Sequence, residues 1–120
     1  MPDPVDAPLL DPVMLAKLRK IGGPALLTRF IDTFMSYAPA RMDLAEAAAG
    51  SGDTATVAAV AHGLISSAGQ LGATDLSAVS REVERLASAG DIDAVLARLP
   101  AWCAAFDSAL AALDHIRSDP

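Results

Sequence analysis

The sequence predicts an all-α protein: an antiparallel up-and-down four-helix bundle with a short additional helix at its N-terminus. Hydrophobic residues make up 52% of the 120 residues but aromatic ones only 4%, so alanine and leucine dominate, and these favour helix. Apolar residues recur at spacings of three and four, without the alternation typical of strands. Short loops of two to four residues separate these segments, as between antiparallel neighbours in a bundle.

The first helix is predicted to begin at Asp11-Pro12, with aspartate as the N-cap and proline at the first helical position. Residues 1–8, which hold three prolines, are expected to form a disordered lead-in. Gly22-Gly23 should end this short helix. Its apolar face would contain Leu15, Leu18 and Ile21.

A second, longer helix is predicted to open at Pro24 and to stop at Gly50-Ser51-Gly52. Pro39 lies inside it and is expected to kink or divide it, because proline lacks the N–H and clashes with the preceding turn. The apolar residues of this helix are Leu26, Leu27, Phe30, Ile31, Phe34, Met42, Leu44 and Ala45.

A third helix is predicted at 54–71, with Asp53 as its cap and Gly72 as its end. A fourth helix should follow, and either Thr74 or Asp75 can cap it. The buried stripe of the latter should contain Leu76, Val79, Val83 and Leu86.

The last helix should begin after Gly90-Asp91 and run to about Ile116, with a bend at Pro100. The predicted bundle therefore covers residues 9–116, and residues 117–120 form a C-terminal tail. Apolar residues follow this helix at spacings of three and four: Ile92, Val95, Leu99, Trp102, Phe106, Leu110 and Leu113.

Composition excludes several classes of protein. A net charge of −6 and a pI near 4.6 argue against nucleic acid and against anionic membrane surfaces. A single cysteine cannot form an internal disulfide, and no signal peptide or apolar run of about 20 residues is visible. We expect a free-standing, monomeric, cytoplasmic protein of bacterial type.

His62 is predicted to point to solvent from the middle of the helix at 54–71. Its position on a helical wheel is roughly 150° from the centre of the apolar stripe. That stripe contains Val57, Val60, Ala61, Leu64, Ala68 and Leu71.

The helix face around His62 carries no charge. Ala58, Ala59, Ser66 and Gly69 lie one or two turns away, and Ile65 borders the patch, where an ordinary solvated face would carry Lys, Glu or Arg. A smooth face of this kind suits close approach by another protein. A neutral imidazole is a nucleophile near neutral pH, so His62 could accept a phosphoryl group from an aspartyl phosphate.

The sequence shows no machinery for activating a phosphate by itself. Gly22-Gly23-Pro24 lacks the lysine and hydroxyl residue of a phosphate-binding loop, and no zinc-ligand pattern is present. His115 complements a helix dipole, and Cys103 is expected to be a small buried hydrophobe. Glu82 and Glu84 are interpreted as a solvated helix face.

Residues 61–73, Ala-His-Gly-Leu-Ile-Ser-Ser-Ala-Gly-Gln-Leu-Gly-Ala, resemble the signature of the histidine-containing phosphotransfer (HPt) family. The resemblance extends over roughly 9–116. It implies a four-helix bundle whose exposed active histidine, here His62, shuttles phosphate between receiver domains of a hybrid sensor kinase and a response regulator. The receiver would supply the aspartate and magnesium, and this chain would need no cofactor.

The sequence departs from the family pattern at two positions. Ser66 replaces the usual glycine, and Ile65 replaces a lysine that should attract the phosphoryl charge. Arg81 or Arg85 on the next helix could compensate, and Gln70 could hydrogen-bond near the site.

Three interpretations remain open. The first is that the chain is a phosphoryl carrier rather than an enzyme with its own ATP site. The second is a non-catalytic docking module for receivers or kinases, in which Ile65 has weakened or abolished phosphotransfer. The third is an unrelated helical scaffold. The carrier and the docking module share one face: Ala58, Ala59, Ile65, Ser66 and Gly69. The sequence identifies neither the kinase and regulator nor the direction of phosphate flow.

Overall fold

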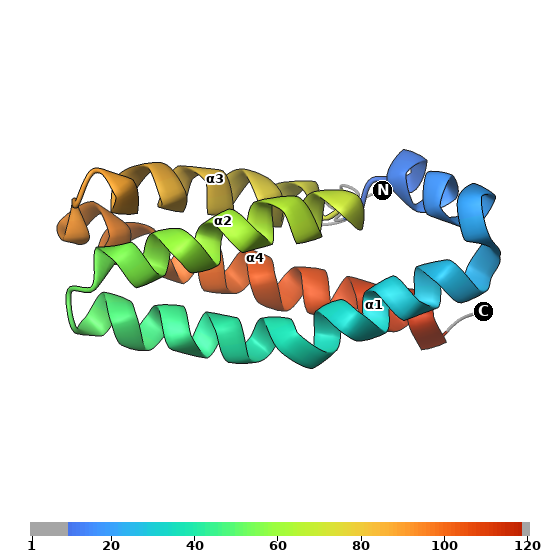
Figure 1. Ribbon diagram of the computed structural model, residues 1–120, viewed down its shortest axis with the longest axis horizontal. Coiled ribbons are helices and arrows are strands. Elements are labelled where there is room, and N and C mark those ends of the chain that lie inside the picture. Colours follow the sequence, from blue (N-terminus) through green and yellow to red (C-terminus); the bar gives the residue numbers. More distant parts are fainter. Residues whose placement is uncertain (1–9, 119–120) are drawn as a thin grey trace, which may run out of the picture.

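The computed structural model describes residues 10–118, so the predicted lead-in at 1–8 and the last two residues of the predicted tail lie outside the described residues. Its four helices are α1 (Pro12–Gly50), α2 (Thr54–Gln70), α3 (Thr74–Ser88) and α4 (Ile92–Ser118), and no strand occurs among the described residues. Each helix packs against the next, and α4 also packs against α1, which closes the bundle (Figure 1). The predicted all-α bundle is confirmed.

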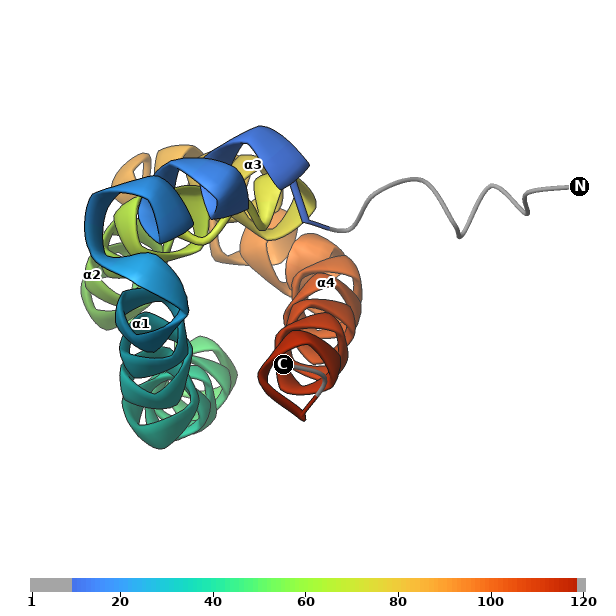
Figure 2. The same ribbon diagram turned by 90° about the vertical axis from the view of Figure 1, so that its right-hand side faces the viewer.

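The additional N-terminal helix is also confirmed, although it is continuous with α1. Gly23 has a φ of 74° and a ψ of −176°, which breaks the helical path inside α1. The residues before this break lie across one end of the bundle, over the ends of α2 and α3 (Figure 2). Glycine allows this change of direction because its backbone adopts positive φ without a steric penalty.

The second helix was predicted to kink or divide at Pro39, and the structure shows that it does not divide there. Within α1 the one non-helical residue is Gly23, and α4 likewise continues through Pro100 to Ser118, two residues past its predicted end. A proline costs a helix one hydrogen bond, but its φ of about −65° is compatible with helical geometry. The packing of both helices in the bundle therefore maintains them through the proline.

Helix caps agree with the sequence at two starts and differ at a third. Asp11 accepts a hydrogen bond from the backbone N–H of Val13, and Asp53 accepts one from that of Thr56. The N-cap of α3 is Ala73, without a side-chain bond, so the prediction of Thr74 or Asp75 as the cap is wrong. Asp75 instead lies in the first turn, where its charge complements the helix dipole.

The core draws side chains from all four helices. At its centre, the fully buried indole of Trp102 donates a hydrogen bond from Nε1 to Oγ of Ser80, at 2.9 Å. This bond explains why a serine occupies a fully buried position on α3, since a buried indole N–H needs an acceptor. Val79 and Leu86, predicted for the same stripe, are half-buried.

Three apolar residues expected on buried faces are exposed instead. Ile21, with 72% of its surface exposed, lies directly before the break at Gly23, where the chain changes direction. Phe30 and Leu44 are also exposed. With Tyr37 between them at intervals of seven residues, they form a stripe on α1 that lies beside the core-facing residues rather than among them.

The sequence showed no apolar run long enough to cross a membrane, but α4 meets a criterion based on helix length and mean hydropathy. Residues Ile92–Arg117 are long and apolar enough to cross a membrane by length and composition, with a mean hydropathy of 1.2 in the most apolar window. Alanines raise this value, and the helix contributes Val95, Trp102 and Phe106 to the bundle core. Core helices of soluble proteins satisfy the same criterion, so this finding is weak support for a membrane span.

A tight turn between α2 and α3 sets the register of the helix pair that carries His62. Gly72 has a φ of 75°, and its carbonyl accepts a hydrogen bond from the backbone N–H of Asp11 at 2.6 Å. A Cβ at this position would approach backbone atoms of Asp11 to 2.8 Å. The start of α1 is therefore attached directly to the turn that aligns α2 with α3.

Candidate functional site

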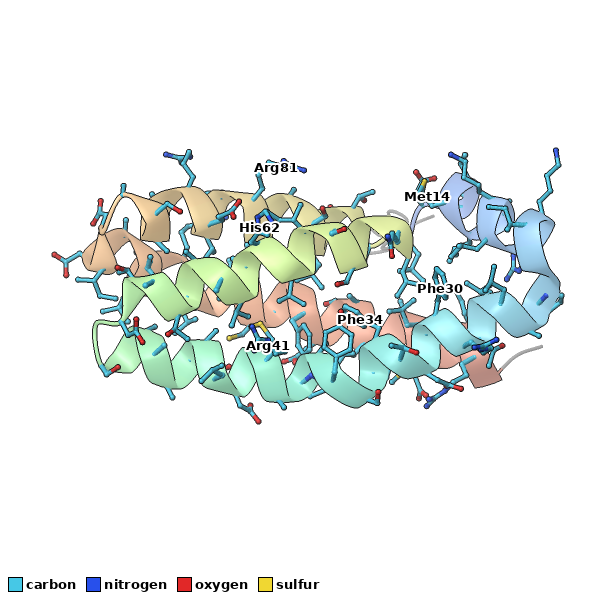
Figure 3. The ribbon with its side chains drawn as sticks, viewed as in Figure 1. Met14, Phe30, Phe34, Arg41, His62 and Arg81 are labelled. Atoms are coloured by element: carbon cyan, nitrogen blue, oxygen red, sulfur yellow. The ribbon has the colours of Figure 1, made fainter. Side chains whose placement is uncertain are left out.

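His62 projects from the outer face of α2, with 78% of its side chain exposed (Figure 3). Residues at i−1 and i+2, Ala61 and Leu64, are buried in the core, which orients the opposite face of the helix outward. The exposed position predicted from the helical wheel is confirmed.

One hydrogen bond orients the imidazole. Nδ1 of His62 lies 2.6 Å from Oε2 of Glu84, which projects from α3 and is half-buried. An ionised carboxylate can only accept, so in the neutral imidazole Nδ1 carries the hydrogen and the lone pair resides on Nε2. The ring therefore presents a free, nucleophilic nitrogen to solvent.

Glu84 was missed from sequence, because it was interpreted as part of a solvated face. A signal was present nonetheless. Ser77, Arg81 and Glu84 are spaced at i, i+4 and i+7 on α3, so they share one face of that helix. A short turn at Gly72 makes α2 and α3 antiparallel neighbours, which brings the end of this stripe to the level of His62.

Residues predicted to form a docking face lie around His62 in two groups. Ala59 and Ser66 are exposed. Ala58, Ile65 and Gly69 are half-buried on the flank next to α3. There the backbone carbonyl of Ile65 accepts a hydrogen bond from Ser77 at 3.0 Å, and a Cβ on Gly69 would lie 3.7 Å from the same hydroxyl oxygen.

Gln70 does not lie beside the imidazole. It is the last residue of α2, about 12 Å along the helix from His62 at 1.5 Å per residue. It lines a groove of about 200 Å³ between α1 and α2, together with Phe30, Thr33, Phe34, Tyr37, Ser67 and Leu71.

The groove was not expected from the sequence, in which Phe30 was one of the apolar residues at helical spacing. Tyr37 donates a hydrogen bond to Oγ of Ser67 at 2.6 Å, and that hydroxyl donates to the carbonyl of Gly63 at 2.8 Å. This chain of bonds joins α1 to the turn of α2 that follows His62. Exposed aromatic surface thus continues the uncharged face of α2 onto α1.

Neither of the other two candidate nucleophiles fits the chemistry. Burial, followed by a hydrogen bond to Glu46, raises the pKa of the Cys103 thiol to about 12, so this group is protonated at neutral pH. His115 lies in the last turn of α4, as expected for a histidine that complements the helix dipole. Within residues 10–118 no group of three or more His, Cys, Asp or Glu side chains is placed to hold a metal ion.

Comparison with known proteins agrees with this arrangement. Residues 29–118 match the model of the protein family described as the Hpt domain. The chain belongs to the Hpt domain family. Its helices also superpose on the crystal structure of histidine-containing phosphotransfer protein B from Pseudomonas aeruginosa PAO1 with a TM-score of 0.87.

The two chains are 24% identical, and the match covers 95% of this chain and 98% of the other, so it establishes a shared fold. No curated protein gives a match. Family membership confirms the resemblance drawn from residues 61–73.

Proposed function

We propose that this protein carries a phosphoryl group on Nε2 of His62 and passes it between receiver domains of a phosphorelay. The observation that carries the proposal is the hydrogen bond from Nδ1 to Glu84 on a ring that is otherwise exposed. This combination leaves Nε2 accessible to a partner and holds its lone pair outward. Membership in the Hpt domain family supports the same chemistry.

The transfer step needs no proton movement. The Nε2 lone pair attacks phosphorus, the P–N bond forms, and the P–O bond to the receiver's aspartate breaks, with the electron pair leaving on the carboxylate. The imidazole then carries a positive charge, and its Nδ1–H remains bonded to Glu84. A carboxylate in this place stabilises the charged ring, because a hydrogen bond between ionised groups is stronger than one between neutral groups.

The receiver would supply the aspartate and the magnesium ion, and this chain would supply the nucleophile and an uncharged surface. Ala59 and Ser66 are small and exposed, so a partner's active site can approach the imidazole closely. The apolar groove on α1 would extend the contact beyond the histidine.

The alternative, a docking module without phosphotransfer, rests on Ile65. In the structure, this residue is half-buried at the flank next to α3, so only part of its side chain is available to a partner. The alternative predicts receiver binding that is independent of His62.

The test is intact-mass analysis and peptide mapping after mixing the protein with phosphorylated receiver domains and magnesium. We expect an acid-labile phosphoryl adduct on His62 that is lost in His62→Gln. His115→Gln is the matched control, since it removes the other histidine of the chain and should leave the adduct unchanged. Receiver binding without any adduct would favour the docking module, and neither binding nor an adduct across a broad panel would contradict both.

A further inference from the structure

A phosphoryl group on His62 would place about two negative charges on the surface of α2, next to a carboxylate. Glu84 already lies 2.6 Å from the ring. Ile65, one turn further along α2, cannot offset this charge, and neither Ala58 nor Ala59 on the preceding turn is charged. A nearby cation would stabilise the loaded form, and α2 itself carries none.

The stripe of α3 that faces this part of α2 contains a cation, Arg81. Ser77, Arg81 and Glu84 occupy i, i+4 and i+7 and therefore lie on one side of α3. Both ends of the stripe contact α2: the hydroxyl of Ser77 donates to the carbonyl of Ile65, and Glu84 bonds to His62. Arg81 lies between these two contacts, level with the turn of α2 that runs from His62 to Ile65.

Arg81 is exposed. Among residues 10–118, the ion pairs made by arginine involve Arg98 and Arg117, and Arg81 takes part in none. In Figure 3, Arg81 projects outward from α3 above His62, and its guanidinium points away from the imidazole. Cβ atoms one turn apart on a helix are about 5–6 Å from each other, so the arginine side chain is long enough to span the distance from its own turn to that of Glu84.

We infer that Arg81 binds the phosphoryl group carried by His62, and so supplies from α3 the positive charge that position 65 of α2 lacks. This inference rests on the proposed function. A guanidinium suits the task because its planar N–H groups donate two parallel hydrogen bonds to phosphoryl oxygens. Glu84 would then hold the ring through Nδ1 while Arg81 holds the group attached to Nε2.

Arg85 is the other cation considered on α3. It is exposed, but it lies about 100° around the helix from Glu84, whereas Arg81 lies about 60° from it, so Arg85 is turned further from α2. Arg85 therefore shares the charge, helix and exposure of Arg81 without its position, which makes it a matched control.

The test uses phosphoramidate, a small donor of phosphoryl groups to imidazole, so that loading of His62 does not depend on docking. Loading is followed by phosphorus NMR and intact mass in the wild type, Arg81→Gln and Arg85→Gln. We expect Arg81→Gln to load about three to ten times more slowly at low salt, and Arg85→Gln to remain within about twofold of the wild type. The difference in loading rate should shrink as salt rises, because dissolved ions screen exposed charges over a Debye length of roughly 8 Å at physiological ionic strength.

Rescue separates a charge effect from a structural one. Ile65→Lys in the Arg81→Gln background restores a cation one turn from His62, and we expect it to recover most of the lost rate. Equal loading of Arg81→Gln and the wild type would overturn the inference and leave the proposed function intact, as would equal losses in both arginine variants. A wild-type protein that accepts no phosphoryl group, from phosphoramidate or from any receiver, would overturn the proposed function itself.

Discussion

In the proposed reaction, Glu84 selects the nitrogen of His62 that would accept the phosphoryl group. Its carboxylate accepts from Nδ1 at 2.6 Å, and this contact directs Nε2 to solvent. The bond joins residues 22 positions apart, so it depends on the packing of α2 against α3 rather than on local sequence. Glu84 acts on the reaction through the imidazole and is therefore a positioning residue.

Removing this carboxylate should slow phosphoryl loading without unfolding the protein. We expect Glu84→Ala to lower the rate about tenfold, because a hydrogen bond to a charged group is lost and both ring tautomers become populated. Nitrogen-15 NMR of the imidazole provides a readout that a purely structural role would not affect, since it reports the tautomer directly.

Glu82→Ala is the control, because Glu82 pairs with Arg98 on α4 rather than with His62. Glu84→Gln should fall between the alanine variant and the wild type, since an amide oxygen still accepts from Nδ1 but carries no charge. A Glu84→Ala protein that loads as fast as the wild type, with an unchanged tautomer, would rule out this role.

Sequence reasoning identified the exposed histidine but not the residues that surround it. His62 was placed correctly because helical periodicity alone sets its direction, opposite Ala61 and Leu64. Glu84 was not placed correctly, because the sequence does not reveal how far α3 is shifted along α2, and this shift decides which residue of α3 reaches His62. The exposure of Phe30 was not predicted either, because apolar spacing does not distinguish a core residue from one on an exposed apolar surface.

Helix ends were predictable where a glycine or a capping side chain marks them. Asp53, Gly72 and the Gly22-Gly23 pair all lie at observed boundaries or breaks. The division predicted as one outcome at Pro39 did not occur, because packing along the bundle maintains a helix that local preference disfavours. Tertiary contacts outweigh the loss of one backbone hydrogen bond at each proline.

The turn between α2 and α3 should be the connection most sensitive to substitution. Gly72→Ala combines a positive φ with a 2.8 Å approach to backbone atoms of Asp11, whereas Gly90→Ala has a similar φ of 73° in open space. We expect Gly90→Ala to reduce the free energy of unfolding by about 1–2 kcal/mol, and Gly72→Ala to reduce it by roughly 1–3 kcal/mol more.

Urea unfolding followed by tryptophan fluorescence measures both values. The turn also sets the register that brings Glu84 to His62, so Gly72→Ala should slow phosphoryl loading in the fraction that remains folded, whereas Gly90→Ala should not. Equal destabilisation by the two substitutions would show that the contact with Asp11 contributes little.

The bundle as a whole separates its reactive surface from its core. His62 is exposed, and its hydrogen-bond partner comes from the edge of the neighbouring helix, while the apolar core runs through all four helices. Ser80 lies directly before Arg81 in α3, yet its side chain faces inward to Trp102. Chemistry on the outer faces of α2 and α3 therefore need not disturb the packing beneath them.

We accordingly expect phosphorylation to leave the fold unchanged and the protein to act as a rigid carrier. Trp102, the single tryptophan of the chain, lies beneath the site and should keep its emission maximum when His62 is loaded. Unfolding by urea should give one transition that coincides by fluorescence and by circular dichroism in both forms, since a single core joins the helices. Changes in backbone amide shifts should be confined to the turns of α2 and α3 around His62, Arg81 and Glu84. A shifted Trp102 emission, or shift changes that extend through α4, would instead show that the phosphoryl group repacks the core and that the bundle switches conformation when loaded.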